Sequence, residues 1–335
     1  MNHLKKSWEN NTDIKDIPEL VLDKIASRGS FVVVKRKKDG SQLDKLNDKI
    51  LKNYFKIWME NISNNFIEIK LGKTINKIEN KKDTVIIIGN GPSLYEKNHM
   101  DLLKNIKNIT LIATEGVLKN LLRNGIVPQY VMNIDGNREL IIEHYNTPLL
   151  DTTKTEAIMS IVVSHNVVNR FPNNIYFYTP MFDDTENDIS LTKSISTITG
   201  APILYTGSNV GIASIYLSEY LNFKNIILIG IDLGYSPQTK VEESTYYNIV
   251  KEVMPDITPD QYKDMFIIEG YNPDFNVNYY TNIAWYSDIE VIIEHSKELS
   301  DKGIQLINCT EGGALHGGKI LGMKFVDALD KYDKI

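Results

Sequence analysis

The sequence predicts an α/β fold in which a doubly wound, mostly parallel sheet is covered by helices on both faces. From residue 84 onward, short runs of apolar and often β-branched residues alternate with segments of helical periodicity. The apolar runs contain almost no polar residues, which is typical of parallel strands buried on both faces. In such a fold, a ligand is expected beyond the carboxyl ends of the strands.

The first 80 residues differ in composition, and we expect them to form a small α+β region ahead of a main domain at residues 81–335. Residues 18–27 begin with proline and are predicted to form a short helix. Residues 31–42 resemble a strand that enters an Asp-Gly turn. Residues 46–62 place their apolar side chains on one stripe, which predicts an amphipathic helix.

The main domain is predicted to contain an alternating series of strands and helices. The predicted strands are residues 85–88, 109–113, 130–134, 158–163, 175–178, 226–231 and 304–307. The clearest predicted helices are residues 115–123, 209–221 and 288–302.

Composition limits the class of function. The chain has 335 residues, of which 42% are hydrophobic and 24% are charged, as in ordinary soluble proteins. The net charge of −6 argues against a nucleic-acid partner, for which a basic surface would be expected. No apolar run approaches the ~20 residues that span a bilayer, and the amino-terminal segment does not resemble a secretory signal. With Cys309 as the only cysteine, no internal disulfide can form, and we expect a cytoplasmic protein.

The first predicted strand of the main domain ends in the loop GNGPSL, residues 89–94. Gly89 and Gly91 permit a tight turn and the close approach of a ligand. Asn90 adds an amide, and Ser93 lies where a helix can begin, with free backbone amides that favour an anion. The spacing matches neither GxGxxG nor GxxxxGK[ST]. A purely structural turn is the alternative, but a loop at this place in the sheet favours a ligand.

A second polar loop, NIDGN at residues 133–137, follows the predicted strand 130–134. Asn133 and Asp135 should therefore lie on the same edge of the sheet as GNGPSL. Asp135 is suited to a ribose, a magnesium ion or an acceptor hydroxyl. An Asx turn followed by a helix explains the same residues equally well.

Small polar residues also open the predicted helix at 209–221, which gives a second helix N-terminus suited to an anion. The strand after this helix ends near Asp232, with Tyr235 shortly behind it. An aspartate at the carboxyl end of a strand is a candidate functional residue, whereas packing explains Tyr235 equally well. The small polar residues are Thr206, Gly207, Ser208 and Asn209.

The last motif, NCTEGGALHGG, occupies residues 308–318. Thr310 and Glu311 follow a predicted strand, and four glycines within seven residues indicate backbone crowding or ligand contact. His316 can titrate near neutrality, as can His165, which directly follows a strand. A single histidine is more often structural, so position alone makes these two residues candidates.

Spacings typical of metal sites and of covalent catalysis do not occur in the sequence. It contains no CxxC, HExxH or EF-hand pattern, so no metal site is predicted. It also contains no GxSxG elbow, so a covalent nucleophile is not predicted.

GNGPSL, GSNVGIAS, GIDLGYS and NCTEGGALHGG occur in this order within residues 84–325. Together they resemble the bacterial motility accessory factor family, whose central domain shares a family with the archaeal MptE-like 6-hydroxymethylpterin diphosphokinases. The GNGPSL start and the small-residue helix followed by GID are also similar to bacterial sialyltransferases, which use CMP-sialic acid, have a Rossmann-like fold and need no metal.

The resemblance implies a glycosyltransferase that moves a nonulosonic acid (sialic, pseudaminic or legionaminic type) from a CMP-activated donor. The acceptor would be a Ser or Thr hydroxyl of a flagellin-like protein, or a glycan. No cofactor would be required, and a homo-oligomer is possible. The sialyltransferases use a histidine as general base in a segment that does not align here, which leaves His316, His165 and Asp135 as candidates by position.

The resemblance also implies roles for the motif residues. The residues of GNGPSL would lie against the phosphate and ribose of the nucleotide. The residues at the start of the small-residue helix would lie against the donor sugar or the cytidine. The remaining motif residues would line the same cleft. The expected substrate-binding residues are Gly89, Asn90, Gly91, Ser93, Asn133, Thr206, Gly207, Ser208, Asn209, Asp232, Tyr235, Thr310 and Glu311.

Two other functions stay open. NIDGN resembles the DLDGN segment of the pterin diphosphokinases, where aspartates would hold magnesium. Asn133 replaces the first aspartate here, and a neutral amide contributes less charge toward Mg²⁺. In that function Asp135 would be the lead ligand and ATP the substrate. The other possibility is a non-catalytic assembly factor that binds a nucleotide sugar with the same fold.

Overall fold

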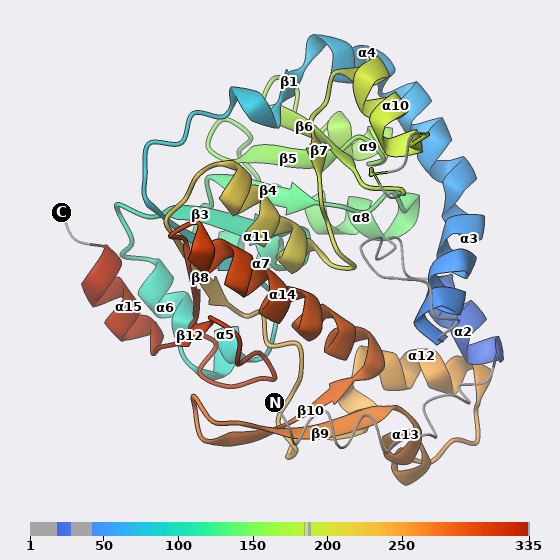
Figure 1. Cartoon of the computed structure of the whole chain (residues 1–335), viewed down its shortest axis with the longest axis vertical. Coiled ribbons are helices and arrows are strands. Elements are labelled where there is room, and N and C mark those ends of the chain that lie inside the picture. The colour runs from blue at the N-terminus through green and yellow to red at the C-terminus, as the bar shows by residue number, and fades with distance from the viewer. Residues whose placement is uncertain (1–18, 28–41, 184, 187–188, 334–335) are drawn as a thin grey trace.

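The computed structural model describes residues 19–27, 42–183, 185–186 and 189–333 (Figure 1). A sheet of ten strands forms its centre, in the order β1-β6-β5-β4-β3-β2-β8-β11-β12, with β7 beside β6. Every strand pair in this sheet is parallel, which confirms the predicted doubly wound α/β fold. The strands are β1 (Lys73–Thr74), β2 (Thr84–Ile88), β3 (Thr110–Thr114), β4 (Tyr130–Asn133), β5 (Glu156–Ser160), β6 (Ile175–Pro180), β7 (Ile203–Leu204), β8 (Asn225–Ile229), β11 (Gln305–Asn308) and β12 (Leu321–Gly322).

The chain changes direction across the sheet at β2. It runs outward from β2 through β3, β4 and β5 to β6, and then returns to place β8 and β11 on the other side of β2. The carboxyl ends of β2 and β8 therefore border a switch point, the place where doubly wound folds bind ligands.

Helices cover both faces of the sheet, and alternate residues of β2 contact different layers. Val85 and Ile87 pack in one apolar core that includes α11. Ile86 and Ile88 pack in a second core with α6, α7 and α15. The helices are α2 (Glu19–Ala26), α3 (Gln42–Asn64), α4 (Phe66–Leu71), α5 (Ser93–Glu96), α6 (His99–Leu103), α7 (Glu115–Arg123), α8 (Arg138–Tyr145), α9 (His165–Val168), α10 (Leu191–Thr199), α11 (Val210–Tyr220), α12 (Thr245–Val253), α13 (Pro259–Phe266), α14 (Ile283–Asp301) and α15 (Phe325–Tyr332).

Each predicted strand of the main domain is present, with shifts at some ends. β8 ends at Ile229, two residues before the predicted end, because Gly230 turns the chain with a φ of +63°. α14 begins at Ile283, five residues before the predicted start, where Asn282 caps it by accepting a hydrogen bond from the backbone of Trp285. The predicted strand 31–42 lies outside the described residues, apart from Gln42, which begins α3.

The two predicted helices of the amino-terminal region are present as α2 and α3. On α3, the predicted stripe faces the interior, with Ile50, Tyr54 and Trp58 buried. The Nδ2 group of Asn61, on the same helix, donates hydrogen bonds to the carbonyl oxygens of Gly136 (2.9 Å) and Val162 (2.8 Å), in the loops after β4 and β5. α3 therefore braces the carboxyl edge of the sheet. The division of the chain at residue 80 stays a prediction.

The structure also contains a segment that the sequence patterns do not indicate, residues 241–282, which we call the cover segment. It consists of α12, α13 and an antiparallel hairpin of β9 (Ile267–Asn272) and β10 (Val277–Asn282). Two backbone hydrogen bonds between Tyr235 and Tyr280, of 2.9 and 2.8 Å, attach it to the loop after β8. Most of its apolar side chains form a cluster of their own with Val21 and Leu22 of α2, which lies beside α12 in Figure 1. Tyr279 of β10 instead packs in the sheet core that includes α11.

Within the described ranges, no helix combines the length and the apolar character needed to cross a membrane.

Candidate functional site

A cavity of about 290 Å³ lies at the switch point. The loops after β2, β8 and β11 contribute Ser93, Asp232, Tyr235 and Glu311 to its lining, and the cover segment contributes Tyr279 from β10. The structure thus brings together four predicted substrate-binding residues from three separate motifs. Lys97 also lines the cavity and supplies a positive charge.

Ser93 and Asp232 form a buried contact at the base of the cavity. The hydroxyl of Ser93 donates a hydrogen bond of 2.9 Å to Oδ2 of Asp232. Burial raises the pKa of Asp232 to about 7, the hydrogen bonds from Ser93 oppose this rise, and the nearby Glu96 adds to it. A carboxyl with a pKa near neutrality can exchange a proton at physiological pH, as general acids and bases do.

The glycines of GNGPSL allow the loops after β2 and β8 to approach each other. A Cβ atom on Gly89 would lie 2.3 Å from the carbonyl oxygen of Gly230, and one on Gly91 would lie 2.0 Å from Oδ2 of Asp232. The backbone N–H of Gly91 donates to the Gly230 carbonyl oxygen at 2.8 Å. The motif predicts that a ligand approaches these glycines closely. In the structure, the loop after β8 makes this close approach.

Asn90 is exposed and lies on the side of the loop that faces α7. Its Oδ1 accepts a hydrogen bond from the hydroxyl of Tyr95. The Nδ2 group of Asn120 on α7 donates to the Tyr95 hydroxyl at 2.6 Å and contacts Asn90 Oδ1 at 3.4 Å. This network connects the GNGPSL loop to α7.

Glu311 is fixed in the cavity wall by two hydrogen bonds to its Oε1. Nε2 of the fully buried His99 lies 3.2 Å away, and the backbone N–H of Phe325 donates at 3.0 Å. Burial lowers the pKa of His99, which favours a neutral ring that donates through Nε2. Glu311 also adopts a φ of +55°, a left-handed conformation that is strained for a residue with a side chain. The neighbouring Thr310 is buried, and its hydroxyl donates to the Gly312 carbonyl oxygen at 2.8 Å.

The small polar residues before α11 make contacts with α14. The Ser208 hydroxyl and the Asn209 Nδ2 group, at 2.6 Å, both donate to the carboxyl group of Asp288. Asn209 also caps α11 by accepting from the backbone of Ile212, and Thr206 is buried. Gly207 has a φ of +59°, where a Cβ atom would lie 2.7 Å from the Ile212 side chain. Burial raises the pKa of Asp288 to about 6. The predicted contact of residues 206–209 with a donor stays a prediction.

Asn133 and Asp135 end β4 on the same edge of the sheet. Oδ1 of Asp135 accepts a hydrogen bond of 2.6 Å from the backbone of Asn137, which is the Asx turn foreseen as the structural alternative. Asn133 is fully buried, and neither atom of its amide has a hydrogen-bond partner in the part of the chain that the structure describes. Among those same residues, no cluster of three or more His, Cys, Asp or Glu side chains is suited to a metal ion.

The two candidate histidines occupy different places. His316 is 9% exposed, and its ring lies 6.0 Å from the ring of Tyr279, which lines the cavity. Burial lowers the pKa of His316. His165 begins α9 beyond β5, and its Nδ1 contacts Oδ1 of Asn65, the residue before α4, at 2.9 Å. Since β5 is three strands from β2, about 14 Å at the usual spacing, His316 is nearer the cavity.

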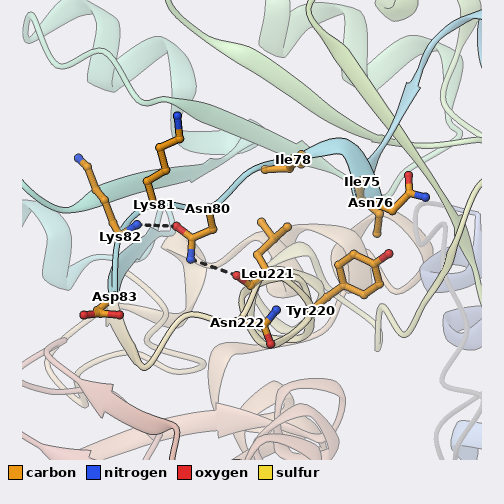
Figure 2. Close-up of a pocket in the computed structure, with 10 residues that line it drawn as sticks. All are labelled: Ile75, Asn76, Ile78, Asn80, Lys81, Lys82, Asp83, Tyr220, Leu221 and Asn222. Carbon is orange, nitrogen blue, oxygen red and sulfur yellow. Dashed lines mark hydrogen bonds between the residues drawn. The ribbon is translucent and has the colours of Figure 1, made fainter.

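A larger cavity, of about 500 Å³, lies at the opposite edge of the sheet, before β2. Figure 2 shows that Lys81 and Lys82 extend away from Tyr220 and Asn222, on its other wall. The Asn80 side chain is engaged, because it accepts from the Lys82 backbone at 2.9 Å and donates to the Leu221 carbonyl oxygen at 3.0 Å. This cavity holds none of the predicted site residues, so we place the candidate site at the switch point.

Comparison with protein families decides the relationship that the motifs indicate. The family model described as "6-hydroxymethylpterin diphosphokinase MptE-like" matches residues 57–238, more than half of the chain. The chain belongs to the MptE-like family. The part that matches this family includes Ser93 and Asp232, whereas the cover segment and Glu311 lie outside it.

The MptE-like chain also resembles a solved structure, that of the MAf glycosyltransferase from Magnetospirillum magneticum AMB-1. The TM-score is 0.58 at 13% sequence identity, which shows a shared fold. The match covers 92% of this chain and 47% of the other, so the chain spans about half the length of that protein. No curated protein matches the sequence.

Two residues of the candidate site have no clear sequence signal. His99 is an isolated histidine between an asparagine and a methionine, and only the fold places it beside Glu311. Tyr279 belongs to the hairpin that the apolar patterns do not indicate. Lys97 was detectable in principle, since it follows the GNGPSL motif closely.

Proposed function

We propose that this MptE-like protein is a glycosyltransferase that moves a nonulosonic acid from a CMP-activated donor to a hydroxyl group of a protein or glycan. The observation that carries the proposal is the switch-point cavity, where Ser93, Asp232 and Glu311 from three motifs meet. The shared fold with a MAf glycosyltransferase supports it. A cytoplasmic location and a possible homo-oligomer belong to the same proposal.

The proposed reaction breaks the bond between the sugar and the CMP phosphate and forms a bond to the acceptor oxygen. Negative charge grows on the leaving phosphate, and Lys97 is the cation of the cavity that can stabilise it. The glycosyl centre becomes oxocarbenium-like as CMP departs. Glu311, whose Oε1 is held by two donors, is suited to accept hydrogen bonds from sugar hydroxyls.

The proton of the acceptor hydroxyl must pass to a base. We assign this role to His316, behind Tyr279, because burial lowers its pKa and keeps the ring neutral. Asp232, with a pKa of about 7, is the second group of the site that can exchange a proton near neutrality.

The family description favours a second candidate function, a diphosphokinase that acts on a hydroxymethylpterin. This reaction would use Mg²⁺ to bridge the phosphates of ATP. Asp135, at the end of β4, would be the lead ligand on the protein side.

Nucleotide binding in the presence of EDTA separates the two functions. We expect CMP and CTP to raise the melting temperature with EDTA present, and Lys97→Ala to reduce this shift. The matched control is Lys81→Ala, in the cavity at the opposite edge, which should leave the shift unchanged. Stabilisation by ATP that requires Mg²⁺ would favour the diphosphokinase. Failure of both nucleotides would favour a non-catalytic assembly factor.

A further inference from the structure

Three buried polar groups without hydrogen-bond partners lie at the start of α7, at the end of β4 and at the end of α8. They are the side-chain amide of Asn133, Oε2 of Glu115 and the hydroxyl of Tyr145, and the statement covers the described residues. An unsatisfied buried polar group destabilises the folded state, and native proteins contain few of them. A group of three in one place therefore points to a ligand.

The sheet register explains why these groups are neighbours. Thr114 of β3 pairs with Met132 of β4, so Glu115 and Asn133 occupy the next positions at the carboxyl ends of adjacent strands. The Met132 sulfur accepts a hydrogen bond from Ser214 of α11, so Met132 faces α11. Because side chains alternate along a strand, Asn133 points to the opposite face, where α7 lies.

Two tyrosines complete the group. The Tyr178 hydroxyl donates to the carbonyl oxygen of Asn133 at 2.8 Å. Tyr145, the last residue of α8, is 1% exposed. Burial raises the pKa of both tyrosines, and the nearby Glu115 adds to the rise. Glu115 as a residue is half-buried, although its Oε2 atom is enclosed, so part of the residue is open to solvent at the sheet edge.

The position of Glu115 in the fold indicates what kind of ligand this is. It follows the second strand of the doubly wound order and comes 24 residues after Gly91. In doubly wound folds that bind dinucleotides, an acidic residue at this strand end, about 20 residues after the glycine loop, binds a ribose hydroxyl. The helix that Glu115 begins also contacts the GNGPSL loop, through Asn120 and Asn90.

We propose that Glu115, Asn133 and Tyr145 bind the ribose hydroxyls of the nucleotide. A ribose diol offers two O–H donors and two oxygen acceptors. The Glu115 carboxyl and Asn133 Oδ1 accept hydrogen bonds from the ribose O–H groups. The Asn133 Nδ2 group and the Tyr145 hydroxyl donate hydrogen bonds to the ribose oxygens. This inference deepens the proposed function and rests on its nucleotide part alone, since CMP and ATP carry the same diol.

The charge state of Glu115 agrees with this role. Burial raises the pKa of Glu115 to about 8, and the neighbouring Asp135 adds to the rise. The other titratable groups that face it are Tyr145 and Tyr178. A neutral carboxyl can both donate to and accept from a hydroxyl, and it does not repel the phosphate of the same nucleotide.

The experiment compares CMP with 2′-deoxy-CMP by calorimetry at pH 7 with EDTA. We expect the wild-type protein to bind CMP about tenfold more tightly, as one hydrogen-bonded hydroxyl implies. Glu115→Ala removes the carboxyl group and should weaken CMP to about the affinity of the deoxynucleotide. Tyr145→Phe removes only an unpartnered hydroxyl, so it should fold at least as stably as the wild type and also reduce the preference. Glu156→Gln, at the start of β5 on the other edge, is the control and should keep the preference.

Equal affinity of the wild type for the two nucleotides would overturn the ribose assignment, as would a Glu115→Ala variant that keeps the preference. If ATP binds and CMP does not, the CMP-dependent transferase fails. The comparison of ATP with 2′-deoxy-ATP then tests the ribose assignment by itself. If neither ribonucleotide binds, both proposals fail.

Discussion

The hydroxyl of Ser93 donates to the buried carboxyl group of Asp232 across 2.9 Å, and this hydrogen bond joins the two loops of the switch point. Ser93 comes from the loop after β2 and Asp232 from the loop after β8, so the contact connects strands that are far apart in the chain and adjacent in the sheet. Both residues line the candidate site. Changes at either residue should therefore affect stability and binding together.

Ser93→Ala should raise the pKa of Asp232 above its value of about 7, because the charged form loses a donor. The free energy of unfolding should fall by about 1–3 kcal/mol at pH 8, where the carboxyl group is charged, and by less at pH 5, where it is protonated. Urea unfolding at the two pH values measures this difference. Ser63→Ala, at an exposed position of α3, is the control. An equal loss at both pH values would contradict the prediction.

Gly91→Ala should distort the switch point, because the new Cβ atom would lie 2.0 Å from Oδ2 of Asp232 and 2.7 Å from the Gly230 carbonyl oxygen. We expect a lower melting temperature and loss of nucleotide binding. Gly116→Ala is the matched control, since a Cβ atom there meets nothing within 4 Å. In helix α7 alanine should be neutral or stabilise by up to about 1 kcal/mol. Similar melting temperatures for the two variants would contradict the steric argument.

The buried carboxyl group of Asp288 should make stability depend on pH. Burial raises its pKa in the folded protein to about 6, above the ordinary value of 3.8, so the folded state binds this proton more tightly than the unfolded state. The contribution of Asp288 to the free energy of unfolding therefore falls as pH rises from about 4 to about 6, and then levels off. Asp288→Asn removes this titration, so the variant should gain stability relative to the wild type over that range. Parallel urea titrations of both proteins test this, with the exposed Asp256→Asn as control. A constant difference across the range would refute it.

His316→Ala should slow glycosyl transfer by about 10²–10⁴-fold, the usual contribution of a general base, without weakening CMP binding. His165→Ala should keep most of the activity, since β5 lies three strands away from β2. Steady-state kinetics, together with CMP affinity measured by calorimetry, separates catalysis from binding. Full activity of His316→Ala would show that another group is the general base. Asp232→Asn would then be the next variant to measure.

The sheet was predictable because its strands are buried on both faces, and every residue of β2 is buried. The hairpin was not, because β9 and β10 mix buried with exposed positions and carry polar residues such as Glu269 and Asn278. A search for apolar runs does not detect strands of this kind.

The candidate site was predictable as a set of strand ends, but its internal contacts were not. The motif predicted that Gly91 must lack a side chain, whereas only the structure shows that the carboxyl group of Asp232 occupies that space. Likewise, the burial of Asn133 beside Glu115 depends on the register of β3 and β4. Such contacts arise between segments far apart in sequence, so they leave no local pattern.

Most apolar side chains of the cover segment pack on α2 in a cluster of their own. Tyr279 is different, because it packs in the sheet core that also contains Val85, Ile87 and α11. Substitutions at Tyr279 should therefore disturb the sheet core as well as the wall of the cavity. The family match ends at residue 238, just before the cover segment begins. The candidate site therefore combines strand ends that lie inside the family match with a wall residue, Tyr279, that lies outside it and is anchored in the same core as the sheet.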